Sequence, residues 1–123
     1  MRNLAAGKFA AVVLGLSLSA AALAADAESG KKIFVQCSVC HATDGRNGTG
    51  PGLGGLLGRK AGTAPGFRFS RAMKASAIIW NETTLDAYIA APQKVVPGSV
   101  MPFSGVPDAA ARKDLISYLA TLK

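Results

Sequence analysis

The sequence predicts an all-α fold in one small domain, and three observations support this prediction. Apolar residues recur at helical spacing in two stretches, one starting near residue 27 and the other at the C-terminus. No stretch alternates at period two for long enough to form a convincing strand. Long loops rich in glycine and proline bury little apolar surface, so a domain of this size needs a staple such as a disulfide, a metal or a large cofactor.

The N-terminal residues have the layout of an export signal. Two positive charges precede a short apolar run, which closes in the small residues AALAADA. This predicts a signal peptide over residues 1–24 and a mature domain over 25–123, with cleavage after Ala25 or Ala27 also compatible. The alternative is an uncleaved membrane anchor that leaves the domain facing the periplasm, but the run is short and alanine-rich for a membrane span.

The charge pattern narrows the class of partner. The whole chain carries a formal net charge of +7, without a block of like charges. A nucleic-acid-binding arm is therefore not expected. An ordinary solvated surface and a surface that docks an acidic protein both fit this charge.

The first predicted helix covers residues 27–37. Gly30, Ile33, Phe34 and Cys37 follow the i, i+3, i+4, i+7 spacing of one helix face. The helix leads directly into CSVCH, residues 37–41, which holds both cysteines and the single histidine of the chain.

Four chemistries compete for CSVCH. A disulfide between Cys37 and Cys40 would close a very small loop and stabilise little. A thioredoxin-type redox pair should follow a strand in a βαβ unit, whereas this pair ends a helix. A zinc site would have Cys37, Cys40 and His41 but no fourth cysteine or histidine anywhere in the chain.

The fourth chemistry is covalent attachment of haem (heme c), for which C-x-x-C-H is the signature. Two thiols one helical turn apart can each add to one vinyl group at a porphyrin edge, and the adjacent imidazole can reach the iron. Haem would also supply the missing core as a large apolar plate. One covalent haem held by Cys37 and Cys40, with His41 on the iron, is therefore the favoured interpretation.

The segments that follow alternate between loops and helices. Residues 43–66 are rich in glycine and residues 92–107 hold four prolines, so both stretches are expected to be long loops. A short helix is expected from Ser70. A longer helix is predicted to follow Thr83, with Asp86 as its acidic capping partner, and to end before Pro92.

The C-terminal segment is the clearest helix. Pro107 precedes it, Asp108 is the expected N-cap, and Leu115, Leu119 and Leu122 form one stripe. With the helices near 27 and 83, this gives three main helices.

The iron either keeps an open position, as in a haem peroxidase or gas-binding cytochrome, or takes a methionine as its second axial ligand, because no second histidine exists. Met73 lies in a predicted helix, where methionine usually fills gaps in a core. Met101 lies between Pro97 and Pro102 in a loop that could hold its thioether against the iron. His41 and Met101 are therefore the predicted metal ligands, a pair that raises the reduction potential and suits electron transfer.

Nearly all of the mature segment resembles class I cytochrome c, the family of mitochondrial cytochrome c and its periplasmic bacterial relatives. The resemblance rests on an ordered set of segments: GKKIFVQ before CSVCH, then TGPGL, LLGRKAGTAPGF, IIW, TLDAYIAAP, VPGSVMPF and DLISYL. It implies the small class I fold, with three main helices, shorter helices and loops wrapped around one covalent haem.

The resemblance also implies roles for five further residues at the haem site. Pro51 matches the proline whose carbonyl accepts the proximal histidine N–H. Arg59, Trp80 and Ser99 match positions around the haem propionates, and Tyr88 matches the tyrosine near the methionine sulfur.

Some positions depart from the family pattern. Phe69 stands where a propionate-bonding tyrosine is usual, and Met73 stands where an asparagine belongs to a water network near the haem. The lysines that ring the mitochondrial haem edge are replaced at four positions: Gln93, Val100, Pro107 and Asp108.

Taken together, the sequence predicts a periplasmic electron carrier and not an enzyme. It would pass single electrons between a cytochrome bc complex and a terminal oxidase or photosynthetic reaction centre. Docking would be transient and electrostatic, the protein would be a monomer, and it would touch membranes only through its partners.

Overall fold

The computed structural model describes residues 25–123, and its regular elements are all helices. They are α1 (Ala27–Ser38), α2 (Arg71–Ala75), α3 (Glu82–Ala90), α4 (Pro92–Val95) and α5 (Ala109–Leu119). Within the described residues the only β pairing is one isolated antiparallel bridge between Lys60 and Ile79. The all-α prediction is confirmed, while the expected signal peptide lies outside the described residues.

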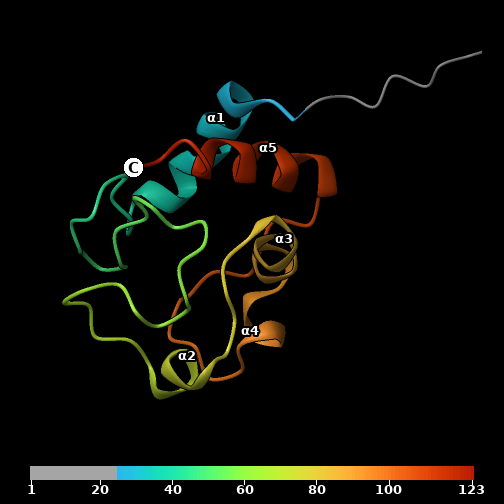
Figure 1. The fold of residues 1–123 in the computed structure, drawn as a ribbon. Coiled ribbons are helices and arrows are strands. Elements are labelled where there is room, and N and C mark those ends of the chain that lie inside the picture. The colour runs from blue at the N-terminus through green and yellow to red at the C-terminus, as the bar shows by residue number, and fades with distance from the viewer. Residues whose placement is uncertain (1–24) are drawn as a thin grey trace, which may run out of the picture.

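The two terminal helices pack against each other, and Figure 1 shows α5 crossing α1 at one end of the domain. A Cβ atom on Gly30 would lie 2.5 Å from the Asp114 carbonyl carbon and 2.9 Å from the Tyr118 Cβ. Only glycine therefore lets the two backbones approach this closely. Beside the crossing, Phe34 packs on Tyr118 with ring centroids 5.2 Å apart, so the predicted apolar face of α1 is confirmed.

The first turn of α1 is fixed by Asp26. Its carboxylate accepts the Glu28 backbone N–H at 2.9 Å and the Ser29 hydroxyl at 2.8 Å. These bonds, with the Ser29 hydroxyl the larger cause, hold the pKa of Asp26 below its usual value. The Asp26 backbone N–H donates to the Asp114 carboxylate at 2.8 Å, which ties the start of α1 to α5.

The predicted start of α3 was wrong by two residues. The helix begins at Glu82 with Asn81 as its N-cap, not after Thr83. The Asn81 side chain accepts the Thr84 N–H and the Thr84 hydroxyl accepts the Asn81 N–H, both at 2.9 Å. This reciprocal capping box satisfies two helix-end donors and defines the start.

Residues 92–107 were predicted to be a loop, whereas Pro92–Val95 form the short helix α4. Its first residue is Pro92, whose missing N–H is no loss at the first position of a helix. The short helix brings Gln93 beside the loop that carries Met101.

The C-terminal helix begins as predicted. The Asp108 carboxylate accepts the N–H groups of Ala110 and Ala111. Leu115 and Leu119 are buried. Leu122 lies beyond the last helical residue but still packs against the edge of the core.

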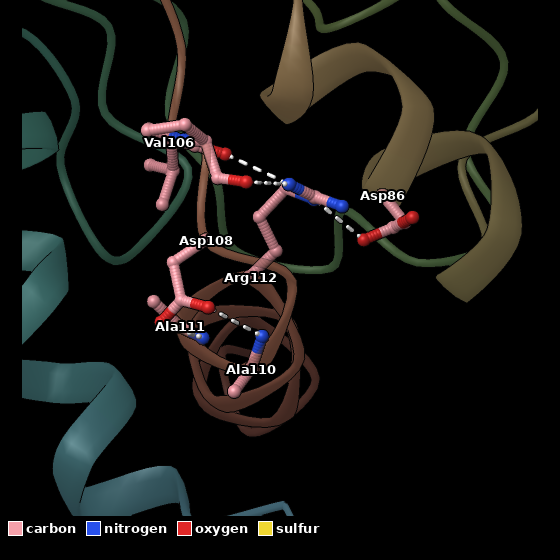
Figure 2. Close-up of polar contacts among 7 residues, drawn as sticks. Asp86, Val106, Asp108, Ala110, Ala111 and Arg112 are labelled. Carbon is pink, nitrogen blue, oxygen red and sulfur yellow. Dashed lines mark hydrogen bonds and ion pairs between the residues drawn. The ribbon is translucent and has the colours of Figure 1, made fainter.

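Arg112 joins α5 to α3 and to the segment between them, as Figure 2 shows. Its Nε donates to the Asp86 carboxylate at 2.7 Å. One terminal nitrogen donates to the carbonyls of Val106 at 3.0 Å and Pro107 at 2.9 Å. The Arg112 side chain is only 12% exposed, so it lies largely out of water.

The glycine-rich loop 43–66 covers the side of the domain opposite α3 and α4 (Figure 1). Asn47 closes it: its amide nitrogen donates to the Pro65 carbonyl at 2.9 Å, and its amide oxygen accepts the Gly52 N–H at 3.1 Å. The loop and the helices together enclose the candidate site.

Candidate functional site

The core encloses a large cavity with a volume of about 440 Å³. Side chains from α1, α2, α3, α5 and both long loops line it, and most of them are apolar. This size and apolar lining are typical of cofactor pockets. Cys37, Cys40, His41 and Met101, the four residues predicted to hold haem iron and its porphyrin, all line this one cavity.

The backbone turns sharply at CSVCH. The backbone N–H groups of Cys40 and His41 both donate to the Cys37 carbonyl, at 3.1 Å and 3.0 Å. Both thiols are free, so the structure contains no disulfide here. Among residues 25–123 no group of three or more cysteine, histidine or acidic side chains could hold a metal ion by itself, which leaves the zinc alternative without support.

The imidazole of His41 is fixed from both sides. Its Nδ1 lies 2.7 Å from the Pro51 carbonyl oxygen, the contact expected for Pro51. With the proton assigned to Nδ1, Nε2 keeps its lone pair for a metal. A Cβ atom on Gly50 would lie 2.5 Å from the imidazole Cε1 and 2.7 Å from Nδ1, so Gly50 leaves the space that the ring occupies. No pattern in the sequence indicated this role of Gly50.

Met101 presents its thioether to the cavity from the second long loop. The Tyr88 hydroxyl lies 3.9 Å from the Met101 sulfur, as expected for Tyr88. Burial raises the pKa of Tyr88, and its hydrogen bond with the Ser99 side chain opposes this shift. The tyrosine therefore keeps its proton, which it can donate to the sulfur.

Met73 also lines the cavity, from α2, and is 9% exposed within the core cluster. The structure thus brings both methionines to the same space. Only Met101 has a polar partner at its sulfur, since no hydrogen bond to the Met73 sulfur occurs among the described residues.

Arg59 places a positive charge on the cavity wall. Its guanidinium donates to the carbonyls of Gly54 at 3.3 Å and Gly52 at 3.0 Å, and burial lowers the pKa of Arg59. Arginine keeps its charge despite such a shift, so this group suits the carboxylates of a haem propionate.

Trp80 lies beside Arg59, because the Trp80 backbone N–H donates to the Arg59 carbonyl at 2.9 Å. The Trp80 ring is 6% exposed and packs on Tyr88, with centroids 4.9 Å apart. Ser99 reaches the same cavity, and its hydroxyl lies 3.5 Å from the Met101 backbone nitrogen. All the predicted site residues therefore line one cavity.

The donor set fits haem. Two free thiols and an oriented imidazole lie on one wall, with a thioether and a tyrosine hydroxyl from other elements. Burial, and then the neighbouring Cys40, raises the pKa of Cys37. The Cys37 thiol therefore keeps its proton, and Cys37 and Cys40 would hold a haem through thioether bonds.

Comparisons with known proteins give a consistent result. A family model described as cytochrome c matches residues 27–123. Cytochrome c2 of Rhodoblastus acidophilus is 45% identical over 102 residues, which cover 81% of this chain and 95% of that protein. Cytochrome c2 of Rhodomicrobium vannielii is 44% identical over 117 residues, covering 93% of this chain and 94% of the relative.

A solved structure agrees with the sequence matches. Cytochrome cH from Methylobacterium extorquens superposes with a TM-score of 0.76 at 43% identity. The match covers 78% of this chain and 98% of that structure.

Proposed function

The chain belongs to the cytochrome c family, and we propose that it is a periplasmic one-electron carrier whose iron is bound by His41 and Met101. Membership establishes an electron-carrying cytochrome with one haem c attached through Cys37 and Cys40. The observation that carries the proposal is the convergence of His41 and Met101 on one apolar cavity, each with a polar partner at its ligand group.

When bound, the haem supplies a reversible one-electron change between Fe(III) and Fe(II). The protein residues fix its surroundings. Pro51 orients the His41 imidazole through Nδ1, and Tyr88 donates toward the Met101 sulfur. Arg59 compensates negative charge at the cavity wall. An apolar lining keeps water away and, with methionine ligation, favours a high potential.

Two side-chain ligands would saturate the iron, so we propose that the protein transfers electrons without substrate chemistry. Its partners would be a cytochrome bc complex as donor and a terminal oxidase or photosynthetic reaction centre as acceptor. Docking would be brief, with the carrier as a monomer. The net positive charge favours an acidic partner surface.

The proposed location is the periplasm, reached through a signal peptide over residues 1–24 that leaves the domain 25–123. Two cytochromes c2 of bacteria are among the relatives. No helix within residues 25–123 is long and apolar enough to cross a membrane.

Exchange of each methionine tests the ligation. Met101→Ala should abolish the weak red Fe(III)–S absorption band, lower the potential and open the iron to small ligands. Met73→Leu is the matched control, because it alters a cavity methionine of the same chain and should keep the band. The opposite pattern would show that Met73 is the ligand.

Oxidation of the reduced protein by isolated bacterial membranes tests the role as a carrier. The rate should fall as salt is raised, because screening weakens attraction between exposed charges on the two partners. A rate that rises with ionic strength would contradict docking on an acidic surface.

A further inference from the structure

The Gln93 side chain joins α4 to the loop that carries Met101. Its side-chain amide nitrogen donates to the Ser99 carbonyl at 2.9 Å and to the Met101 carbonyl at 3.4 Å. An amide NH₂ group has two hydrogens, so it can serve both carbonyls. One side chain on α4 thus reaches across to the backbone of the methionine itself.

Few other contacts hold this stretch of backbone. The neighbouring Val100 side chain is 74% exposed and adds little packing. The Ser99 N–H donates to the Val96 carbonyl at 3.1 Å, and the Met101 carbonyl also accepts the Phe103 N–H at 2.9 Å. The bond from the Met101 N–H to the Ser99 hydroxyl is long at 3.5 Å. In the described part of the chain, the Ser99 carbonyl accepts a hydrogen bond only from Gln93.

The position of Gln93 makes it an effective anchor. Pro92 opens α4 and is buried, and the Val96 N–H returns to the Pro92 carbonyl at 2.9 Å. The Gln93 backbone is therefore fixed relative to the core before its side chain reaches the loop. From the sequence, Gln93 was notable only as a position that lacks the usual lysine.

We propose that Gln93 is a positioning residue. Its side-chain amide fastens the loop that follows α4 and so holds the Met101 thioether in the haem cavity. The proposal rests on Met101 being the iron ligand, as proposed above. Gln93 does not touch the iron or the haem. It sets how often the loop opens and the sulfur leaves.

The expected effect is that of one ordinary hydrogen bond, because the second of the two bonds is long at 3.4 Å. Because Gln93 is exposed, water can replace the lost donor in part. One ordinary hydrogen bond contributes about 0.5–1.5 kcal/mol, which corresponds to about a twofold to tenfold change in the loop equilibrium. An external ligand that binds only after the sulfur leaves should bind more tightly by the same factor.

Three substitutions of Gln93 distinguish the effect of its N–H donor from the effect of its side-chain size. Gln93→Met keeps the length of the side chain without a donor and should loosen the loop. Gln93→Glu places acceptor oxygens against two carbonyls and should loosen it further. Gln93→Lys keeps N–H donors at similar reach and should behave like the parent protein.

The experiment is a titration of the oxidised holoprotein with imidazole at neutral pH, followed through loss of the red band. We expect apparent affinity to rise about twofold to tenfold for Gln93→Met, to rise more for Gln93→Glu, and to stay unchanged for Gln93→Lys. Lys94→Gln lowers the net charge by one, as Gln93→Glu does, and should match the parent protein.

The outcomes distinguish this proposal from the one on which it rests. If Met101→Ala leaves the red band intact, the ligand assignment fails. If Met101→Ala removes the band but Gln93→Met and Gln93→Glu bind imidazole like the parent protein, only the role of Gln93 is overturned. Equal gains for Gln93→Glu and Lys94→Gln would also overturn it, because net charge would then explain the effect.

Discussion

Arg112 and Asp86 form an ion pair, yet we predict that losing the arginine costs far more than losing the aspartate. The Arg112 side chain is 12% exposed and Asp86 is 45% exposed. Asp86 makes one hydrogen bond to Arg112, whereas Arg112 also donates to the carbonyls of Val106 and Pro107 (Figure 2). The two residues thus lose different numbers of bonds.

The magnitudes follow from burial. A hydrogen bond from a charged donor contributes about 1.5–3 kcal/mol, and a half-exposed ion pair contributes at most about 1 kcal/mol. Arg112→Met should therefore lower the free energy of unfolding by about 3–5 kcal/mol, because two carbonyls lose their donor. Asp86→Ala should cost about 1 kcal/mol.

Urea unfolding of the holoprotein, followed by circular dichroism, measures both costs without the screening that guanidinium would add. With a slope of about 1.5 kcal/mol per molar urea, the midpoint should shift by about 2–3 M for Arg112→Met and by less than about 1 M for Asp86→Ala. Arg46→Met is the matched control: its pair with Asp44 lies at 2.9 Å, but Arg46 is 83% exposed, so no measurable shift is expected. Equal costs for Arg112→Met and Asp86→Ala would refute the reasoning.

Two further predictions concern the proximal wall and the first helix. Gly50→Ala should displace the His41 imidazole, because the added Cβ overlaps the ring. A changed Soret spectrum and a lower thermal midpoint would show this displacement. An unchanged spectrum would contradict it. The lowered pKa of Asp26 means that its carboxylate stabilises the folded state above its ordinary pKa of 3.8, and that this contribution is lost as pH falls below that value. The parent protein should therefore be more stable than Asp26→Asn near neutral pH, and the two thermal midpoints should converge in acid; a constant difference at all pH values would contradict it.

Residue patterns along the sequence predicted those parts of the fold that depend on neighbouring residues in the chain. The Gly30 face of α1, the Asp108 cap of α5 and the grouping in CSVCH all follow from spacing along the chain. The start of α3 shows the limit of such rules. Asn81 and Thr83 could each cap a helix, and only the reciprocal bonds with Thr84 select Asn81.

Other contacts could not be predicted from the sequence, because no short sequence pattern indicates that the residues involved lie close together. Arg112 and Asp86 lie 26 residues apart, and their bond depends on how α5 meets α3. Gly50 is one glycine among many in its loop, and its role appears only once the His41 ring lies against it. Gln93 required α4 to be known before its reach to Ser99 could be seen.

The resemblance to class I cytochrome c supplied what spacing could not. Pro51 and Tyr88 are ordinary loop and helix residues by composition, yet the structure places them at the His41 nitrogen and the Met101 sulfur. Their positions follow from the packing of the whole chain around one cavity.

The measurement that tests the central claim most directly is exposure of the native reduced protein to carbon monoxide, with absorption recorded over seconds. If His41 and Met101 both bind the iron, no position is open and the spectrum should not change, while Met101→Ala should bind the gas rapidly. Rapid binding by the native protein would contradict a saturated electron carrier and would indicate an open site suited to ligand or peroxide chemistry.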